Sequence, residues 1–242
     1  MGGVRAWLGA AIAIAAATGG VTAACAPHRP EEPPRTSAAP LRTPRSEPPS
    51  ASPESRRPRP EPIRRRRSIA VGSPAAGRLV GGVRLPAERR SFLTWDPVLR
   101  RSPNRRWRRW GTDRLVRILL AVARGYRGSH PHAARIAIGD LSRPRGGDFG
   151  LRFGPIGHAS HQNGLDADVY YPRADGRERP PRSASQIDRG RSQELVDRFL
   201  AEGAQVIFVG PDTGLRGPPG RVQSLVNHDN HLHVRLPAAA SR

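Results

Sequence analysis

Five of the eight histidines lie in two short stretches of the chain, residues 157–168 and 227–233. Histidine is a frequent metal ligand and proton carrier, so such a concentration indicates a site of chemistry. In the second stretch, His231 and His233 are separated by one residue, and in a strand both side chains face the same side. The alternation of polar and apolar residues over 231–236 predicts a strand with one apolar and one functional face.

The carboxylates of the first stretch follow the same rule. Asp166 and Asp168 share one face of a predicted strand, while Ala167 takes the packed face. His161 precedes Asp168 by seven residues, and a turn at Gly164 can bring its imidazole back beside the carboxylate. The two stretches together can therefore supply histidines and a carboxylate to one place.

Two histidines and one carboxylate, with an open fourth position, are the usual ligands of a catalytic zinc ion. Each pair also has an ordinary explanation. A His-x-His is often an incidental strand pair, and an Asp-x-Asp is often a turn or a helix cap. Their co-occurrence in one chain favours a metal site. No role is predicted for the remaining histidines, His28, His130 and His132.

Composition narrows the chemistry further. The 242-residue chain carries 41 basic residues against 20 acidic ones, a net charge of +21, and all 41 are arginine. Without lysine there is no Schiff-base enzyme, no P-loop lysine and no Ser-x-x-Lys catalytic centre. Cys25 is the only cysteine, which excludes an intrachain disulfide, a four-cysteine zinc site and an iron–sulfur cluster.

The N-terminal region predicts export. Residues 1–24 read as a signal peptide, with Arg5 before an apolar run and small residues leading up to Cys25. A cysteine in this place is typical of bacterial lipoproteins, in which the thiol is acylated; plain secretion is the alternative. Residues 25–68 are rich in Pro, Arg and Ser and predict a disordered linker. We expect a location in the periplasm or cell envelope, with a candidate lipid anchor at Cys25.

Residues 69–237 have the pattern of one folded domain, with a short tail at 238–242. Apolar residues spaced three and four apart predict two helices, at 113–124 with Thr112 as N-cap and at 193–202. Short extended pieces and turns are predicted over 69–86, and strands at 135–141, 166–171, 206–209 and 231–236. Helices and strands mix without a regular alternation, which favours the α+β class over a doubly wound sheet.

The two histidine stretches closely resemble the penicillin-insensitive murein endopeptidases, which are grouped with the D-Ala-D-Ala peptidases and Hedgehog-like zinc folds. The resemblance is carried by the run Gly157–Gln162 with Gly164, Asp166 and Asp168, and by His228, His231 and His233 followed by Val234-Arg235-Leu236. Upstream matches extend it over most of residues 69–237. It implies a small, mostly antiparallel sheet flanked by helices. Residues 172–192 have no counterpart in that pattern, and the domain lacks the cysteines of family members.

The resemblance also implies roles for individual residues. Carried over position by position, the zinc ligands would be His161, Asp168 and His233. The catalytic histidine beside the metal-bound water would be His231, and the pocket would be completed by His158 and His228. Asp166 would orient a ligand imidazole from behind.

The activity implied is zinc-dependent hydrolysis of the D-alanyl–meso-diaminopimelyl cross-links between the stem peptides of peptidoglycan. Two alternatives stay open: a zinc D,D-carboxypeptidase or L,D-type peptidase acting on uncross-linked stems, and a non-catalytic wall-binding lipoprotein. The arginine excess would favour encounter with murein carboxylates, although base composition explains it equally well. Nucleic-acid binding is not expected, because the chain offers charge without a stacking platform or a known motif. The oligomeric state cannot be inferred.

Overall fold

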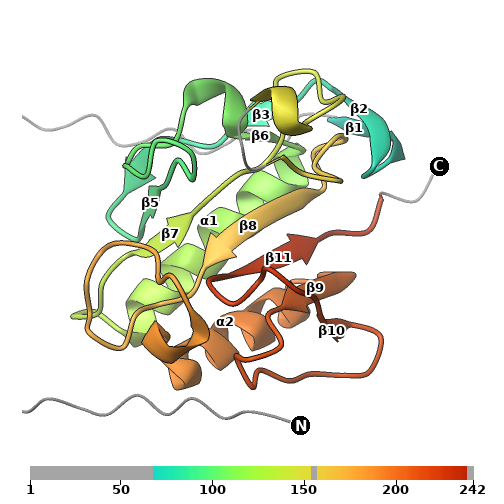
Figure 1. Cartoon of the computed structure of the whole chain (residues 1–242). Helices are drawn as coiled ribbons and strands as arrows, with labels where there is room; N and C mark the ends of the chain where they lie inside the picture. The colour runs from blue at the N-terminus through green and yellow to red at the C-terminus, as the bar shows by residue number, and fades with distance from the viewer. Residues whose placement is uncertain (1–67, 154–156, 239–242) are drawn as a thin grey trace, which may run out of the picture. The chain divides into compact units, whose positions relative to one another are not determined.

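The structure is a computed structural model that describes residues 68–153 and 157–238 (Figure 1). The predicted signal peptide, Cys25, the linker up to residue 67 and the tail from residue 239 lie outside the described residues. Among the described helices, none is long and apolar enough to cross a membrane.

A seven-stranded sheet forms the centre of the domain (Figure 1). From one edge to the other its strands are β10 (Val222–Ser224), β9 (Val206–Val209), β11 (His231–Arg235), β8 (Asp166–Tyr170), β7 (Ile136–Ile138), β5 (Phe92–Thr94) and β4 (Glu88–Arg89). Neighbours are antiparallel except in the pairs β10–β9 and β7–β5. With the two α-helices described below, this mostly antiparallel sheet confirms the predicted α+β class.

Two further pairs of strands complete the described secondary structure together with three short 3₁₀ helices. The antiparallel pairs are β1 (Ile69–Ser73) with β2 (Ala76–Val80), and β3 (Val83–Arg84) with β6 (Trp110–Gly111). The 3₁₀ helices span Arg106–Arg108, Leu151–Phe153 and Ala184–Gln186. The glycine-rich segment 69–86 therefore forms short strands and turns, as predicted.

Helix α1 (Asp113–Ser129) begins at the predicted cap. The Thr112 side chain accepts a hydrogen bond from the Leu115 N–H at 3.2 Å, which satisfies one of the free donors of the first turn. Its buried stripe includes Leu115, Leu119 and Val122, each worth roughly 1.5–3 kcal/mol when removed from water. The helix extends five residues beyond residue 124, where the prediction ended.

Helix α2 (Arg189–Ala201) begins four residues before the predicted start at residue 193. The Asp188 carboxylate accepts a hydrogen bond from the Arg191 N–H at 3.0 Å and caps this first turn. That turn was missed because it is polar and has no apolar periodicity. The helix ends before Gly203, whose φ of 82° reverses the chain.

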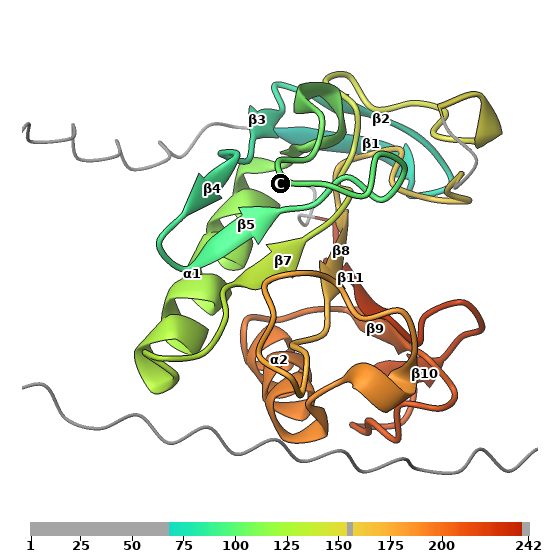
Figure 2. The same cartoon turned by 60° about the vertical axis from the view of Figure 1, so that its left-hand side comes forward.

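The two faces of the sheet are chemically different. Side chains that alternate along β8 and β11 pack with those of α1 and α2 in one apolar core: Ala167, Val169, Leu232 and Val234. Both helices lie behind the sheet in Figure 1, and the turned view of Figure 2 shows them on the same side of it. The remaining side chains of β8 and β11 point to the other face, which carries the polar cluster.

The predicted strand at 135–141 is regular only as far as Ile138. Beyond it, the Gly139 N–H donates to the Asp168 carbonyl oxygen at 2.8 Å, and the Asp168 N–H donates to the Asp140 carbonyl oxygen at 2.9 Å. A Cβ at Gly139 would lie 3.1–3.2 Å from Tyr170 and Asp168 side-chain atoms, a tight contact that would require these neighbours to shift. This irregular continuation of β7 places Asp140 beside the polar face of β8.

Candidate metal centre and cleft

The pairing of β8 with β11 brings the predicted ligand residues together. The strands are antiparallel, with His233 directly opposite Asp168, and Gly164 (φ 77°) turns the preceding loop so that His161 reaches the same point. His161 Nε2 lies 3.2 Å from Asp168 Oδ1 and 3.3 Å from His233 Nδ1. His233 Nδ1 lies 3.2 Å from Asp168 Oδ1. Three potential metal-ligand atoms from separate segments thus form a nearly equilateral triangle.

The ring nitrogens that face away from the triangle differ in their partners. His161 Nδ1 lies 2.5 Å from the carbonyl oxygen of Leu141 and is therefore the protonated, donating nitrogen. His233 Nε2 lies 3.5 Å from Asp166 Oδ1 and forms no hydrogen bond with a described residue. His161 Nε2 and His233 Nδ1 are then the atoms left to bind a cation.

Asp166 is the buried anchor behind the triangle. Its carboxylate accepts hydrogen bonds from Arg235 at 2.7 and 3.1 Å, and from the His161 backbone N–H at 3.0 Å. The bond from the His161 N–H holds this residue at a φ of 70°, a conformation uncommon for residues other than glycine. Burial would raise the pKa of Asp166, but His233 and Arg235 outweigh it and keep the pKa far below its usual range.

The size of the triangle suits a tetrahedral metal ion. Ligands about 2.0–2.1 Å from zinc lie about 3.3–3.4 Å from one another in that geometry, close to the 3.2 and 3.3 Å separations found. Asp168 Oδ1 is buried and accepts no hydrogen bond from the described residues. Buried acceptors need a partner, so the oxygen, nitrogen and nitrogen donor set fits a cation.

The pKa shifts within the cluster are also consistent with a bound cation. Burial lowers the pKa of His161 and favours its neutral, ligating form. Burial would raise the pKa of Asp168, but His161, His231 and His233 hold it well below the usual range. For His233, burial is outweighed by Asp166 and Asp168, and the pKa rises to about 9. A divalent cation between these carboxylates would compete with that extra proton for the same negative field.

His158 belongs to a buried chain of charges beside the triangle. Its Nε2 lies 2.8 Å from Asp140 Oδ2, and Asp140 Oδ1 accepts from Arg108 Nε at 2.7 Å and from the Asn104 amide at 2.9 Å. Arg108 and Asp140 are fully buried. Burial lowers the pKa of His158, but Asp140 and Asp168 raise it more, so the net shift is upward. Asp140 thus fixes the ring that borders the candidate metal site.

A second candidate set replaces His233 by His158. The ligand atoms of His158, His161 and Asp168 all lie within 4.8 Å of one another. Here the His158 Nδ1 is 3.8 Å from Asp168 Oδ2, farther than the corresponding 3.2 Å for His233. The shorter set is therefore the better match to direct coordination, and His158 is better placed as a neighbour of the site.

His231 and His228 complete the histidine cluster at its open side. His231 Nδ1 lies 2.6 Å from the side-chain oxygen of Asn230, and its Nε2 is directed to Asp168 Oδ1 at 3.8 Å. Burial lowers the pKa of His231 to about 4; Asp168 opposes this shift and His228 reinforces it. The His228 ring lies 4.7 Å from that of His231. The six residues predicted as metal ligands or pocket histidines thus gather in one place.

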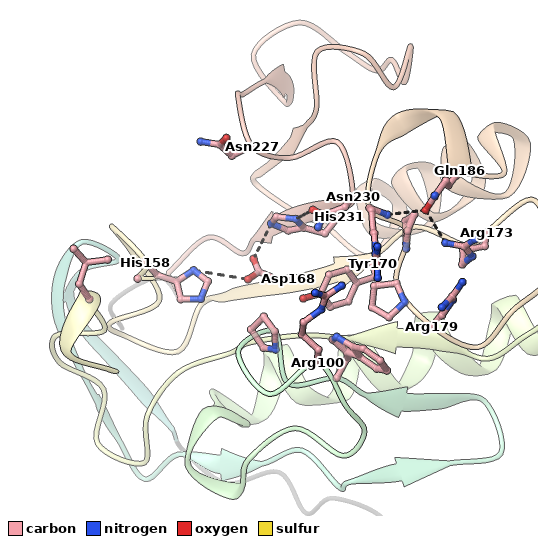
Figure 3. Close-up of a pocket in the computed structure, with 17 residues that line it drawn as sticks. Arg100, His158, Asp168, Tyr170, Arg173, Arg179, Gln186, Asn227, Asn230 and His231 are labelled. Carbon is pink, nitrogen blue, oxygen red and sulfur yellow. Dashed lines mark hydrogen bonds and ion pairs between the residues drawn. The ribbon is translucent and has the colours of Figure 1, made fainter. Parts of the chain in front are cut away.

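This cluster borders a cleft of about 1060 Å³ (Figure 3). His158, Asp168 and His231 line it, together with residues of three loops, 95–100, 173–186 and 227–230. In Figure 3, Tyr170, Arg173 and Arg179 lie on the opposite side of Asp168 from His158. The arrangement combines a triangle of potential metal ligands, a histidine at its open side and a cleft of substantial volume.

A family described as penicillin-insensitive murein endopeptidase matches residues 70–206, more than half of the chain. The chain belongs to this family. The resemblance stated from the two histidine stretches is therefore confirmed.

Individual murein endopeptidases are similar over a larger part of the chain. The penicillin-insensitive murein endopeptidase of Haemophilus influenzae is 27% identical over 212 residues, covering 76% of this chain and 69% of that protein. Those of Salmonella heidelberg and Escherichia coli O157:H7 are 26% and 28% identical, each covering 71% of this chain and 67% of the relative. The family match ends within β9, so β11 with its histidines lies beyond it.

Two buried residues beside the candidate site, Asp140 and Arg108, were not assigned a role from the sequence. Arg108 stands in the run Arg105–Arg109, where every arginine looks equally solvent-exposed in the sequence. Only its position opposite Asp140 distinguishes it, and that contact spans 32 residues. No local pattern could have revealed it.

Proposed function

We propose that this protein is a zinc-dependent murein endopeptidase that hydrolyses D-alanyl–meso-diaminopimelyl cross-links of peptidoglycan. The observation that carries the proposal is the triangle of His161, Asp168 and His233 at the edge of a peptide-sized cleft. Membership of the murein endopeptidase family supports peptidoglycan as the substrate. The buried and pre-oriented ligand atoms support a metal as the source of the chemistry.

Zinc is the ion that this ligand set suits best. Two imidazole nitrogens and one carboxylate oxygen leave one tetrahedral position for water or substrate. Zinc held there would polarise the scissile carbonyl group and acidify a water molecule. His161, Asp168 and His233 would hold the ion, and Asp166 would keep the His233 ring in place through its Nε2.

His231 is proposed as the proton carrier. Its Nε2 faces the open side of the triangle, and burial lowers its pKa, so the ring is neutral at pH 7 with a free lone pair on Nε2. The proton taken from the attacking water at Nε2 would then pass to the leaving amine. Asn230 fixes the ring through Nδ1, so that Nε2 is the nitrogen available.

His158 and His228 would assist the hydrolysis without binding the metal. Because Asp140 holds His158 Nε2, the other nitrogen is directed towards the triangle and Asp168. A proton on that nitrogen would stabilise the negative charge that develops on the carbonyl oxygen. His228, whose ring lies 4.7 Å from that of His231, would shield the proton carrier from solvent.

The cleft supports a water nucleophile over a side-chain nucleophile. None of the described residues that line it is Ser, Thr, Cys or Lys. β-Lactams act by trapping serine nucleophiles, so a cleft without one gives a physical reason for insensitivity to penicillin. We further propose that the protein is exported to the cell envelope, where murein lies, and that Cys25 tethers it to a membrane.

The test is cleavage of cross-linked muropeptide dimers by the purified protein, with products weighed by mass spectrometry. We expect monomers to appear, and expect both a zinc chelator and His161→Ala to abolish them. His132→Ala is the matched control, because His132 is exposed and outside the cluster; it should cleave like the unaltered protein.

Two results would redirect the proposal. If dimers stay intact while the protein binds zinc and removes the terminal residue of uncross-linked stems, it is a carboxypeptidase built on the same centre. If no stem is cut but murein is bound, a non-catalytic wall-binding role remains. Cleavage that survives complete removal of metal would rule out the metal mechanism.

A further inference from the structure

We propose that Arg100, Arg179 and Arg182 form a subsite for a free carboxylate of the peptide substrate beside the scissile bond. This inference rests on the proposed endopeptidase function, because it concerns what the same cleft recognises. The three arginines are assigned to specificity, and none of them to bond cleavage.

The three arginines come from two loops that share the cleft. Arg100 lies in the loop after β5, while Arg179 and Arg182 lie in the loop between β8 and α2. All three line the cleft together with Asp168 and His231. A carboxylate held by them would therefore lie in the same cavity as the proposed reaction centre.

Unlike Arg108, Arg135 and Arg235, these three arginines have no acidic partner among the described residues. Arg108 is paired with Asp140, and Arg235 with Asp166. By contrast, the side chains of the three cleft arginines form no ion pair or hydrogen bond with any described residue. The carboxylate among the described lining residues is Asp168, which is committed to the histidine cluster. The cleft thus offers unpaired guanidinium groups to an anion.

Arg100 is held in an unusual backbone conformation. Its φ is 51°, in the left-handed region that non-glycine residues seldom occupy and that recurs at functional sites. The turn before it is firmly bonded: the Asp96 carboxylate accepts from the N–H groups of Val98 and Leu99, both at 2.9 Å. The Asp96 N–H donates to the Arg101 carbonyl oxygen at 2.8 Å. These bonds place Arg100 at the cleft.

The loop between β8 and α2 is held by Arg173. This residue lines the same cleft, but its guanidinium group donates hydrogen bonds within the loop. It donates to Asp175 at 2.7 Å and to the Gln186 side-chain oxygen at 2.7 Å. The same Gln186 oxygen accepts from the Arg182 backbone N–H at 2.9 Å. Arg182 is therefore anchored by its backbone while its guanidinium stays available. Pro180 and Pro181 stand between the two free arginines and restrict the loop further.

The proposed substrate carries an anion in the right place. In a D-alanyl–meso-diaminopimelyl link, the carbon that bears the scissile amide nitrogen also bears a free carboxylate. Guanidinium groups bind carboxylates through paired, charge-assisted hydrogen bonds. Replacing that carboxylate by its neutral amide removes the charge and introduces two N–H groups. The arginine subsite should therefore distinguish the free from the amidated cross-link.

The experiment compares two cross-linked dimers that differ only in whether this carboxylate is free or amidated. We expect the unaltered protein to have a kcat/KM for the free form higher by roughly ten- to a hundredfold, the range of a charged hydrogen bond. Arg100→Gln, Arg179→Gln and Arg182→Gln should each reduce this ratio while leaving the rate on the amidated dimer nearly unchanged. Arg177→Gln, on the same loop but outside the cleft, should keep the full ratio.

Failure of this inference differs from failure of the proposed function. If the unaltered protein cuts both dimers equally and the variants do the same, the carboxylate subsite is wrong and the endopeptidase stands. If neither dimer is cut, calorimetric binding to the His161→Ala protein decides. Preference for the free dimer, lost in Arg179→Gln, would support the subsite even though another bond is cleaved. Equal binding would overturn it.

Discussion

Leu232 and His233 are neighbours on β11, yet they belong to opposite faces of the sheet. Leu232 is fully buried in the apolar core shared with the helices, and His233 lies beside Asp168 in the polar cluster. The paired strand repeats the division, because Val169 belongs to the core and Asp168 to the cluster. A side-chain period of two thus lets one pair of strands carry both the packing and the chemistry.

Both faces bury side chains but differ in what burial achieves. On the helix face, apolar side chains gain free energy when they leave water. On the other face, Asp166, Asp168 and His161 are buried at a cost in desolvation that their partners only offset. The helix face therefore holds the strands in register, and the polar face uses that register to fix three ligand atoms. Substitutions on the polar face should therefore reduce metal binding and activity, whereas substitutions on the helix face should reduce stability.

The largest expected effect is the loss of the metal centre in His233→Ala. Removing one corner of the triangle should lower activity by more than the roughly 100-fold that loss of an outer-shell partner costs. The fold should persist, because Leu232 and Val234 still pack on the helices. Bound metal, measured by mass spectrometry, and dimer cleavage should fall together while circular dichroism is unchanged. Full zinc occupancy in the variant would contradict the assigned ligand set.

Leu232→Ala should destabilise the fold and leave the metal centre intact. Emptying a fully buried position of the core is expected to reduce the free energy of unfolding by about 2–5 kcal/mol. At temperatures where the variant is still folded, its metal content and cleavage rate should match those of the unaltered protein. Denaturant unfolding measures the first quantity and dimer cleavage the second. A variant that loses metal while still folded would show that the two faces are not separable.

The division between faces could be predicted from the sequence because it is local. The alternation at His231, Leu232 and His233 indicates which side chains share a side, and the observed register bears this out. The helix cap at Thr112 was likewise predicted from neighbouring residues and is confirmed.

What the sequence could not supply are contacts between distant segments. Asp140 and Arg108 are 32 residues apart, and their pairing depends on how β7 continues beyond its regular part. The loop 173–186 lacked any pattern that would place it, because its order comes from side-chain bonds such as those of Arg173 to Gln186. Its position on the cleft became evident only from the fold. Whether the predicted ligands hold zinc stays a proposal.

A smaller effect is expected from Asp166→Asn, which acts from behind the triangle. The amide can still accept the His161 N–H, but it removes the negative charge that faces His233 Nε2 and pairs with Arg235. Metal affinity should fall roughly 10- to 100-fold, while the cleavage rate at saturating zinc changes little. Competition with a fluorescent chelator measures the affinity. An unchanged affinity would show that Asp166 does not orient the ligand.

The smallest effect should come from Thr112→Ala at the junction of the two regions. Its hydroxyl caps α1, and its backbone N–H donates to the Gly164 carbonyl oxygen at 2.9 Å, in the turn between His161 and Asp168. The substitution removes the cap and leaves the backbone bond, so stability should fall by about 1 kcal/mol with metal affinity unchanged. Thr112→Ser should restore stability in urea unfolding. If the alanine variant also weakens metal binding, the helix start helps to position the metal loop, and the two faces are coupled through this turn.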